Sequence, residues 1–193
     1  MKATNILRGV AAAAFISGSM LAVAEQPNYN YLEIGYGVID IDDFSLSGDD
    51  GYWGGFSAQI AEPFYLNGSH QRYDVGGYWS SVDLDISKLN FGYRTAISNG
   101  SDFNFELGYD RIDAGSLDSD GFRASAGIRS MWANSAQSRF YAGYTTDSSG
   151  NDGDYFLGLE GTYAFSEQFG FTLQVETYEF DLNIVRGGIR LMF

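Results

Sequence analysis

The sequence predicts a single antiparallel transmembrane β-barrel of ten strands, and three observations support this prediction. First, Val185, Ile189, Leu191 and the terminal Phe193 alternate with positions that include two arginines, so the chain ends on a strand with one apolar face. Second, 17% of the residues are aromatic and 25 of 193 are glycine, whereas glycine averages about 7%. Third, period-2 alternation continues almost without interruption from Tyr29 onward, as expected for strands between lipid and a polar lumen.

Residues 1–24 are predicted to be a secretory signal peptide. Lys2 and Arg8 form its positive region, Val10 to Val23 is a mostly apolar run, and an A-x-A cleavage site ends at Ala24. The run is shorter than the roughly 18 to 20 apolar residues of a membrane-spanning helix. Residues 25–193 are therefore expected to form one barrel domain in a Gram-negative outer membrane, after cleavage near Ala24.

In the first half of the mature chain, five strands are predicted from apolar residues at alternate positions. Examples are Leu32 and Ile34 in the first strand, and Phe103 and Phe105 in the fifth. Small or polar residues occupy the positions between them, and Glu62-Pro63 marks a tight turn. The predicted strands span about residues 30–39, 52–61, 64–72, 83–95 and 103–112.

Five further strands follow the same rule. Phe122 and Ile128 alternate with arginine, serine and glycine, and Leu157 and Leu159 alternate with glycine and Glu160. These strands span about residues 122–129, 139–146, 155–164, 169–178 and 184–193. Eight strands is the alternative count, because the pattern is weakest in the second to fourth strands.

The predicted connections alternate between short turns and longer acidic segments, a layout typical of bacterial outer-membrane barrels. The long segments cover residues 40–50, 73–82, 113–120 and 147–153. The formal charge of −14 reflects carboxylates in these connections, and an acidic surface repels phosphates, so no nucleic-acid partner is expected. A soluble sandwich or a lipocalin-like barrel would not line one face with glycine and arginine. The absence of cysteine excludes disulfides and a lipoprotein anchor.

Three stretches carry a family resemblance: Tyr109 to Gly115, Leu117 to Phe122 and Ala126 to Ser130. They resemble small outer-membrane barrels linked to diffusible-signal-factor and quorum-sensing regulation. More broadly, residues 29–193 are similar to the opacity-porin and OmpA-type superfamily. That superfamily includes adhesins, narrow pores and structural anchors, so the resemblance implies a porin-like architecture rather than one function.

Strand parity places seven of the nine basic residues of the mature chain inside the barrel, together with five carboxylates. Buried charges must pair or stay hydrated, because an isolated one costs several kcal/mol. Two interpretations stay open: an ion-pair network that fills the barrel, or a narrow arginine-rich pore that favours anions. The predicted lumen charge network is Glu33, Lys88, Arg94, Glu106, Asp110, Arg123, Arg129, Arg139, Glu160, Glu176, Arg186 and Arg190.

Aromatic residues gather toward the strand ends and predict two belts at the membrane interfaces. The belt at the short turns contains Trp132, Phe165, Phe169 and Phe193, and the belt at the long connections contains Tyr52, Tyr73, Tyr109, Tyr144 and Tyr155.

No catalytic, cofactor or metal residue is assigned. His70 is the only histidine, and the adjacent Ser69 faces the other side of its strand, so the two cannot form a dyad. Asp147 to Asp154 is the best candidate for Ca²⁺ or Mg²⁺, but it lacks the EF-hand ligand order and also suits a solvated loop.

The expected function is a non-enzymatic envelope-structural or surface-interaction role through acidic extracellular loops. The alternatives are a narrow pore for small solutes or ions and a lipid-modifying enzyme that uses His70. Expected partners are outer-membrane lipid and lipopolysaccharide, the barrel-assembly machinery and periplasmic chaperones, and divalent cations at the acidic loops. The predicted C-terminal assembly signal is Val185, Ile189, Leu191 and Phe193.

Overall fold

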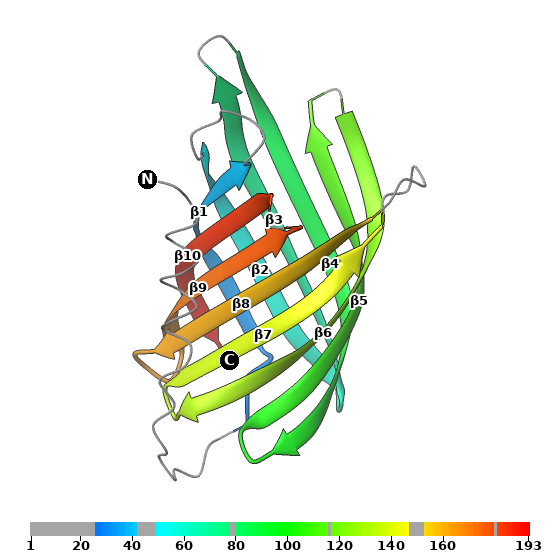
Figure 1. The fold of residues 1–193 in the computed structure, drawn as a ribbon. Helices are drawn as coiled ribbons and strands as arrows, with labels where there is room; N and C mark the ends of the chain where they lie inside the picture. Colours follow the sequence, from blue (N-terminus) through cyan, green and yellow to red (C-terminus); the bar gives the residue numbers. More distant parts are fainter. Residues whose placement is uncertain (1–25, 42–48, 78–79, 116, 147–152, 180) are drawn as a thin grey trace.

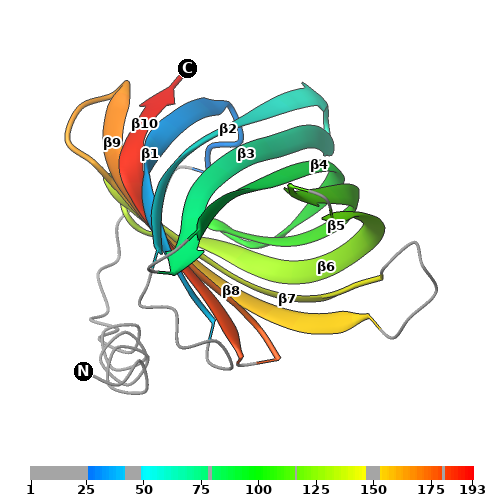
Figure 2. The same cartoon turned by 90° about the horizontal axis from the view of Figure 1, so that it is seen from above.

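The protein folds into a closed antiparallel barrel of ten strands (Figure 1, Figure 2). The computed structural model describes residues 26–41, 49–77, 80–115, 117–146, 153–179 and 181–193. The predicted signal peptide lies outside these residues and stays a prediction. The strands are β1 (Tyr31–Ile41), β2 (Asp49–Ala61), β3 (Phe64–Gly77), β4 (Ser80–Ser98), β5 (Ser101–Ala114), β6 (Leu117–Ala133), β7 (Ala136–Thr145), β8 (Asp154–Ala164), β9 (Phe169–Tyr178) and β10 (Leu182–Met192).

Each strand pairs with its neighbour in the sequence, and β10 closes the barrel against β1. The closing register places Leu32 opposite Leu191 and Glu33 opposite Arg190, so apolar residues share one face and charged residues share the other. A shift of one residue would exchange the two faces. Because all ten strands belong to this one closed sheet, the ten-strand count is confirmed over the alternative of eight.

Side-chain exposure is inverted relative to a water-soluble protein. Ile34 and Phe122 are each 71% exposed on the outer face, whereas Arg190 is completely buried inside. The other strands repeat this arrangement and form a continuous outer surface of Leu, Ile, Phe and Tyr. Such a surface is stable only when lipid covers it, since soluble proteins rarely expose apolar patches of this extent. The barrel is therefore a transmembrane barrel.

The residues described contain no helix with the length and apolar character needed to cross a membrane.

The strands extend further at one end than the sequence pattern predicted. Residues 73–82 and 113–120 were expected to be connections, but β3 and β4 pair as far as Gly77 and Ser80, and β5 and β6 pair as far as Ala114 and Leu117. These two hairpins project at the upper end of the barrel in Figure 1. The outward positions there are charged because they face water, so the apolar alternation ends while the backbone ladder continues.

Most residues of the two predicted aromatic belts lie on the outer face. Trp132, Phe165, Phe169 and Phe193 are exposed at the short-turn end, and Tyr52, Tyr109 and Tyr155 are exposed at the other end. Tyr144 is half-buried, with its ring centroid 4.9 Å from that of Tyr155. The prediction for Tyr73 is wrong: it continues the parity of Gln71 on β3, and its side chain is completely buried inside the barrel.

Candidate functional site

The candidate functional site is the lumen, where equal numbers of opposite charges are buried. Among the described residues, six cations and six carboxylates are buried. Asp102 is the one carboxylate of this set that strand parity had not included, although its position before the outward Phe103 indicates an inward side chain. Arg94 is the one residue of the predicted network outside this buried set. It lies at the short-turn mouth and contacts Asp102 at 3.0 Å. The buried charges are Glu33, Lys88, Asp102, Glu106, Asp110, Arg123, Arg129, Arg139, Glu160, Glu176, Arg186 and Arg190.

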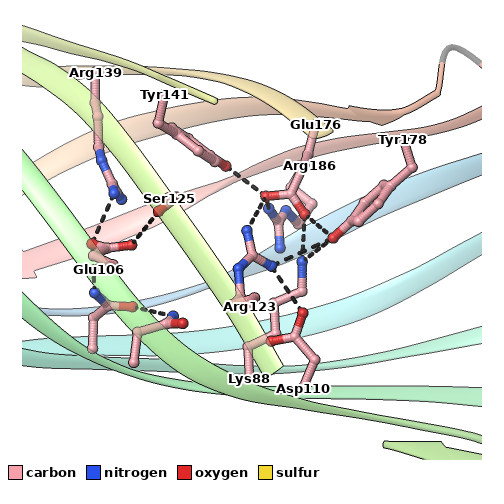
Figure 3. Close-up of polar contacts among 12 residues, drawn as sticks. Lys88, Glu106, Asp110, Arg123, Ser125, Arg139, Tyr141, Glu176, Tyr178 and Arg186 are labelled. Atoms are coloured by element: carbon pink, nitrogen blue, oxygen red, sulfur yellow. Dashed lines mark hydrogen bonds and ion pairs between the residues drawn. The ribbon is translucent and has the colours of Figure 1, made fainter. Parts of the chain in front are cut away.

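The first cluster of charges is centred on Glu176 of β9 (Figure 3). Its carboxylate contacts Lys88 of β4, and it lies 3.5 Å from the Arg123 guanidinium of β6 and 4.0 Å from that of Arg186 on β10. The Tyr141 hydroxyl donates a hydrogen bond of 2.7 Å to the same carboxylate. Side chains from five strands therefore meet at one carboxylate and link both sides of the lumen.

A second cluster is centred on Glu106 of β5. Arg139 approaches this carboxylate at 2.8 Å, and Tyr65 and Asn67 each donate a hydrogen bond of 2.8 Å to it. Ser125 donates a longer hydrogen bond of 3.4 Å. Because the donors come from β3, β6 and β7, Glu106 joins strands that are not all adjacent around the barrel.

A third cluster is centred on Arg190 of the closing strand. Its guanidinium contacts Glu33 at 2.6 Å and Glu160 at 2.8 Å, and its central carbon lies 3.8 Å from the centre of the Tyr31 ring. Arg129 approaches Glu160 from β6 at 3.8 Å. One arginine of β10 therefore ties β10 to the adjacent strand β1 and to β8, which lies two strands away on the other side.

The segment before β1 occupies the short-turn end of the lumen, which the sequence pattern did not reveal. Tyr29 is only 2% exposed, and its ring centroid lies 4.6 Å from that of Tyr65. The guanidinium carbons of Arg94 and Arg129 lie 5.1 and 4.6 Å from the centre of the Tyr29 ring. Arg129 also donates a hydrogen bond of 3.1 Å to the backbone carbonyl of Asn28. Residues 26–30 thus cover this end of the charged interior.

Little free space separates the clusters. The cavity between them measures about 60 Å³ and is bordered by Glu33, Glu106, Arg123, Arg139 and Glu176, among others. This volume suits a few water molecules.

The opposite end of the lumen is apolar, although the sequence predicted a polar interior throughout. Ile39, Tyr73, Ile86 and Ile184 are buried against one another above the charged clusters. They occupy inward positions on strands whose alternation had indicated only outward apolar residues. A cavity of about 400 Å³ opens beside this apolar layer, toward the projecting hairpins.

On the outer surface, His70 contacts two residues of the neighbouring strand. Its Nδ1 lies 2.9 Å from Ser87 Oγ, and its Nε2 lies 3.5 Å from Asp85 Oδ1. Local sequence offers only the adjacent Ser69 as a partner for His70. Ser87 and Asp85 become neighbours of His70 through the pairing of β3 with β4, which local sequence does not specify.

Above the apolar surface, the projecting β3–β4 hairpin carries a pair of facing carboxylates. Asp74 lies opposite Asp83, and the hydrogen bond between them raises the pKa of Asp74. The same hydrogen bond, with a further contribution from Arg72, lowers the pKa of Asp83. As the pH falls, Asp74 therefore takes up a proton before Asp83, and Asp83 keeps its negative charge beside Arg72.

The candidate cation loop, Asp147 to Asp154, lies outside the described residues except for Gly153 and Asp154. Within the described part of the chain, no group of three histidine or acidic side chains is placed to hold a metal ion.

The fold and the lumen together define a class of protein, a transmembrane β-barrel with an interior filled by paired charges. No family model matches the chain, and no curated protein matches it.

Solved outer-membrane barrels resemble the chain in fold. A KdgM porin aligns with a TM-score of 0.47 and 13% identity over 83% of this chain and 99% of the porin. OprG from Pseudomonas aeruginosa aligns with a TM-score of 0.41 and 13% identity over 88% of this chain and 98% of OprG. Ail of Yersinia pestis aligns with a TM-score of 0.42 and 13% identity over 87% of this chain and 100% of Ail. These values concern the barrel architecture alone.

Proposed function

We infer that the protein is an integral outer-membrane barrel whose lumen is closed by its own side chains, and that it has an envelope-structural or surface-interaction role. The observation that carries this proposal is the balance of six buried cations and six buried carboxylates around a space of only about 60 Å³. Opening a path would separate several buried pairs, and breaking one such pair costs about 3–5 kcal/mol. The network therefore favours a plugged barrel.

The pore alternative was an arginine-rich lumen that favours anions or small solutes, and the balance of buried charges weighs against a preference for anions. Recording from refolded protein in planar bilayers tests the proposal: the parent should give no stable single-channel steps. A Glu106→Ala/Arg139→Ala variant is the matched positive control. It removes one carboxylate and one cation together, so it widens the lumen without changing the net charge of the lumen. Stable steps from the parent, at the level of this variant, would contradict the plugged barrel.

The outer-membrane location follows from the apolar outer surface together with the expected signal peptide. Lipid and lipopolysaccharide are then the surroundings of the barrel, and the barrel-assembly machinery and its chaperones act on the nascent chain. The acidic projecting hairpins are the surface offered to partners outside the cell. We also propose that the protein is related to the small outer-membrane barrels linked to quorum-sensing regulation, which its sequence resembles. Recovery of the protein from the soluble fraction, with a gel mobility that boiling does not change, would contradict the location.

The enzyme alternative would use the arrangement of His70, Ser87 and Asp85 on the outer face. A serine hydrolase requires a serine bonded to a histidine base, and the His70–Ser87 distance of 2.9 Å meets that requirement. The 3.5 Å separation of His70 from Asp85 is longer than a hydrogen bond. The lipid profile of a His70→Ala strain should equal that of the parent strain. A change that Ser87→Ala reproduces would establish the enzyme instead.

A further inference from the structure

The outer end of the lumen combines an apolar wall with a volume suitable for a small ligand. Ile86 of β4, Ile112 of β5, and Leu182 and Ile184 of β10 border the cavity. Its volume of about 400 Å³ falls within the range of roughly 300–1,000 Å³ found for small-molecule sites. The charged clusters below close it toward the other end, so the cavity opens toward the projecting hairpins. Its shape and wall suit a compact molecule with an apolar body.

The floor of the cavity offers an acceptor that has no donor. Asp110 lines the cavity and is only 7% exposed. Its Oδ2 accepts a hydrogen bond of 3.1 Å from Arg123, but its Oδ1 has no hydrogen-bond partner among the described residues. A buried carboxylate oxygen without a donor is costly, and a donor that arrives with a ligand removes this cost.

The charges around the cavity are mostly negative. Asp154, Glu179 and Asp181 border it, and Lys88 is the one cation among the described lining residues. Asp120 also borders it, but its carboxylate accepts a hydrogen bond of 2.7 Å from the outward Tyr109 hydroxyl. Lys88 is already engaged, because its ammonium contacts Glu176 and donates a hydrogen bond of 2.7 Å to the Tyr178 hydroxyl. The rim therefore attracts a cation and repels an anion.

We propose that this outer vestibule binds a small amphipathic amine. Its ammonium binds the Asp110 carboxylate at the floor of the cavity, and its apolar body packs against Ile86, Ile112 and Ile184. This site does not depend on whether the lumen below conducts, since the ligand enters and leaves through the same mouth.

The test uses the refolded full-length mature chain in lipid nanodiscs and phenethylamine as the probe. Isothermal titration calorimetry should give saturable binding, whereas the carboxylate 3-phenylpropionate should not bind and the uncharged 2-phenylethanol should bind at least about tenfold more weakly. Equal binding of the amine and the alcohol, or binding of the carboxylate, would overturn the assignment of a cation site.

Two variants locate the site, and each is first checked for a folded, heat-modifiable barrel. Asp110→Asn should weaken phenethylamine binding by about tenfold, because it removes the charged acceptor. Ile112→Gln should also weaken it, and Arg111→Gln is the matched control, since Arg111 lies on the same strand with its side chain on the outer face. Should Asp110→Asn fail to fold, Ile112→Gln decides. Unchanged affinity in Ile112→Gln, or no saturable binding by the parent, would refute the proposal.

Discussion

Removal of the Arg190 guanidinium tests whether buried charge pairs hold the barrel closed. Arg190 is fully buried and contacts Glu33 at 2.6 Å and Glu160 at 2.8 Å. At these distances and an effective dielectric constant of about 20, each contact contributes roughly 6 kcal/mol before desolvation. Arg190→Met retains most of the side-chain volume but leaves two carboxylates without this partner. We expect it to lower the free energy of unfolding by about 3–5 kcal/mol.

The assay is urea unfolding of the barrel in lipid vesicles, followed by tryptophan fluorescence and by heat-modifiable gel mobility. Two comparisons identify the cause. Arg111→Met removes an exposed guanidinium on the outer surface and should cost at most about 1 kcal/mol. Adding Glu33→Gln to Arg190→Met should recover part of the loss, because Glu33 is the carboxylate left without a cation, whereas Glu160 keeps Arg129 at 3.8 Å. A loss for Arg190→Met no larger than that for Arg111→Met would refute the reasoning.

Three further predictions concern other parts of the barrel. Deletion of Phe193 should reduce the yield of membrane-assembled protein more than the urea midpoint of folded protein; equal yields with the parent would contradict an assembly signal. Gly92→Ala should destabilise the barrel by about 1–3 kcal/mol, because the added Cβ would lie 2.2 Å from the Tyr65 ring; an unchanged urea midpoint would exclude that clash. Folding lowers the pKa of Asp83, so its charged form stabilises the folded state above the unfolded pKa, and this stabilisation is lost as the pH falls through the folded pKa. Folding raises the pKa of Asp74, so its contribution to stability has the opposite sign: it is present at low pH and is lost as the pH rises through the folded pKa. Hydrogen exchange of the β3–β4 tip should therefore show an acid-induced loosening that Asp83→Asn abolishes, and an identical pH profile in that variant would count against the pairing.

The inside and outside faces were predictable because strand geometry is local. Successive side chains point to opposite faces, so the alternation of Ile34 with Glu33 and of Ile189 with Arg190 specifies their sides without knowledge of any partner. The same rule would have placed Asp102 and Tyr73 inside. It failed to mark the ends of β3 to β6, because outward residues beyond the lipid are charged and the alternation is lost there.

The sequence by itself determined an antiparallel barrel with apolar residues outside and charged residues inside, and the structure decided for ten strands over eight. Only the tertiary structure decided which charges meet, as when Lys88 contacts Glu176, 88 positions away in the chain. It also decided that Tyr29 covers one end of the lumen and that Ile86 and Ile184 line the other. The physical reason is that contacts across the lumen depend on the closure and stagger of all ten strands together, whereas the face of each residue depends only on its own strand.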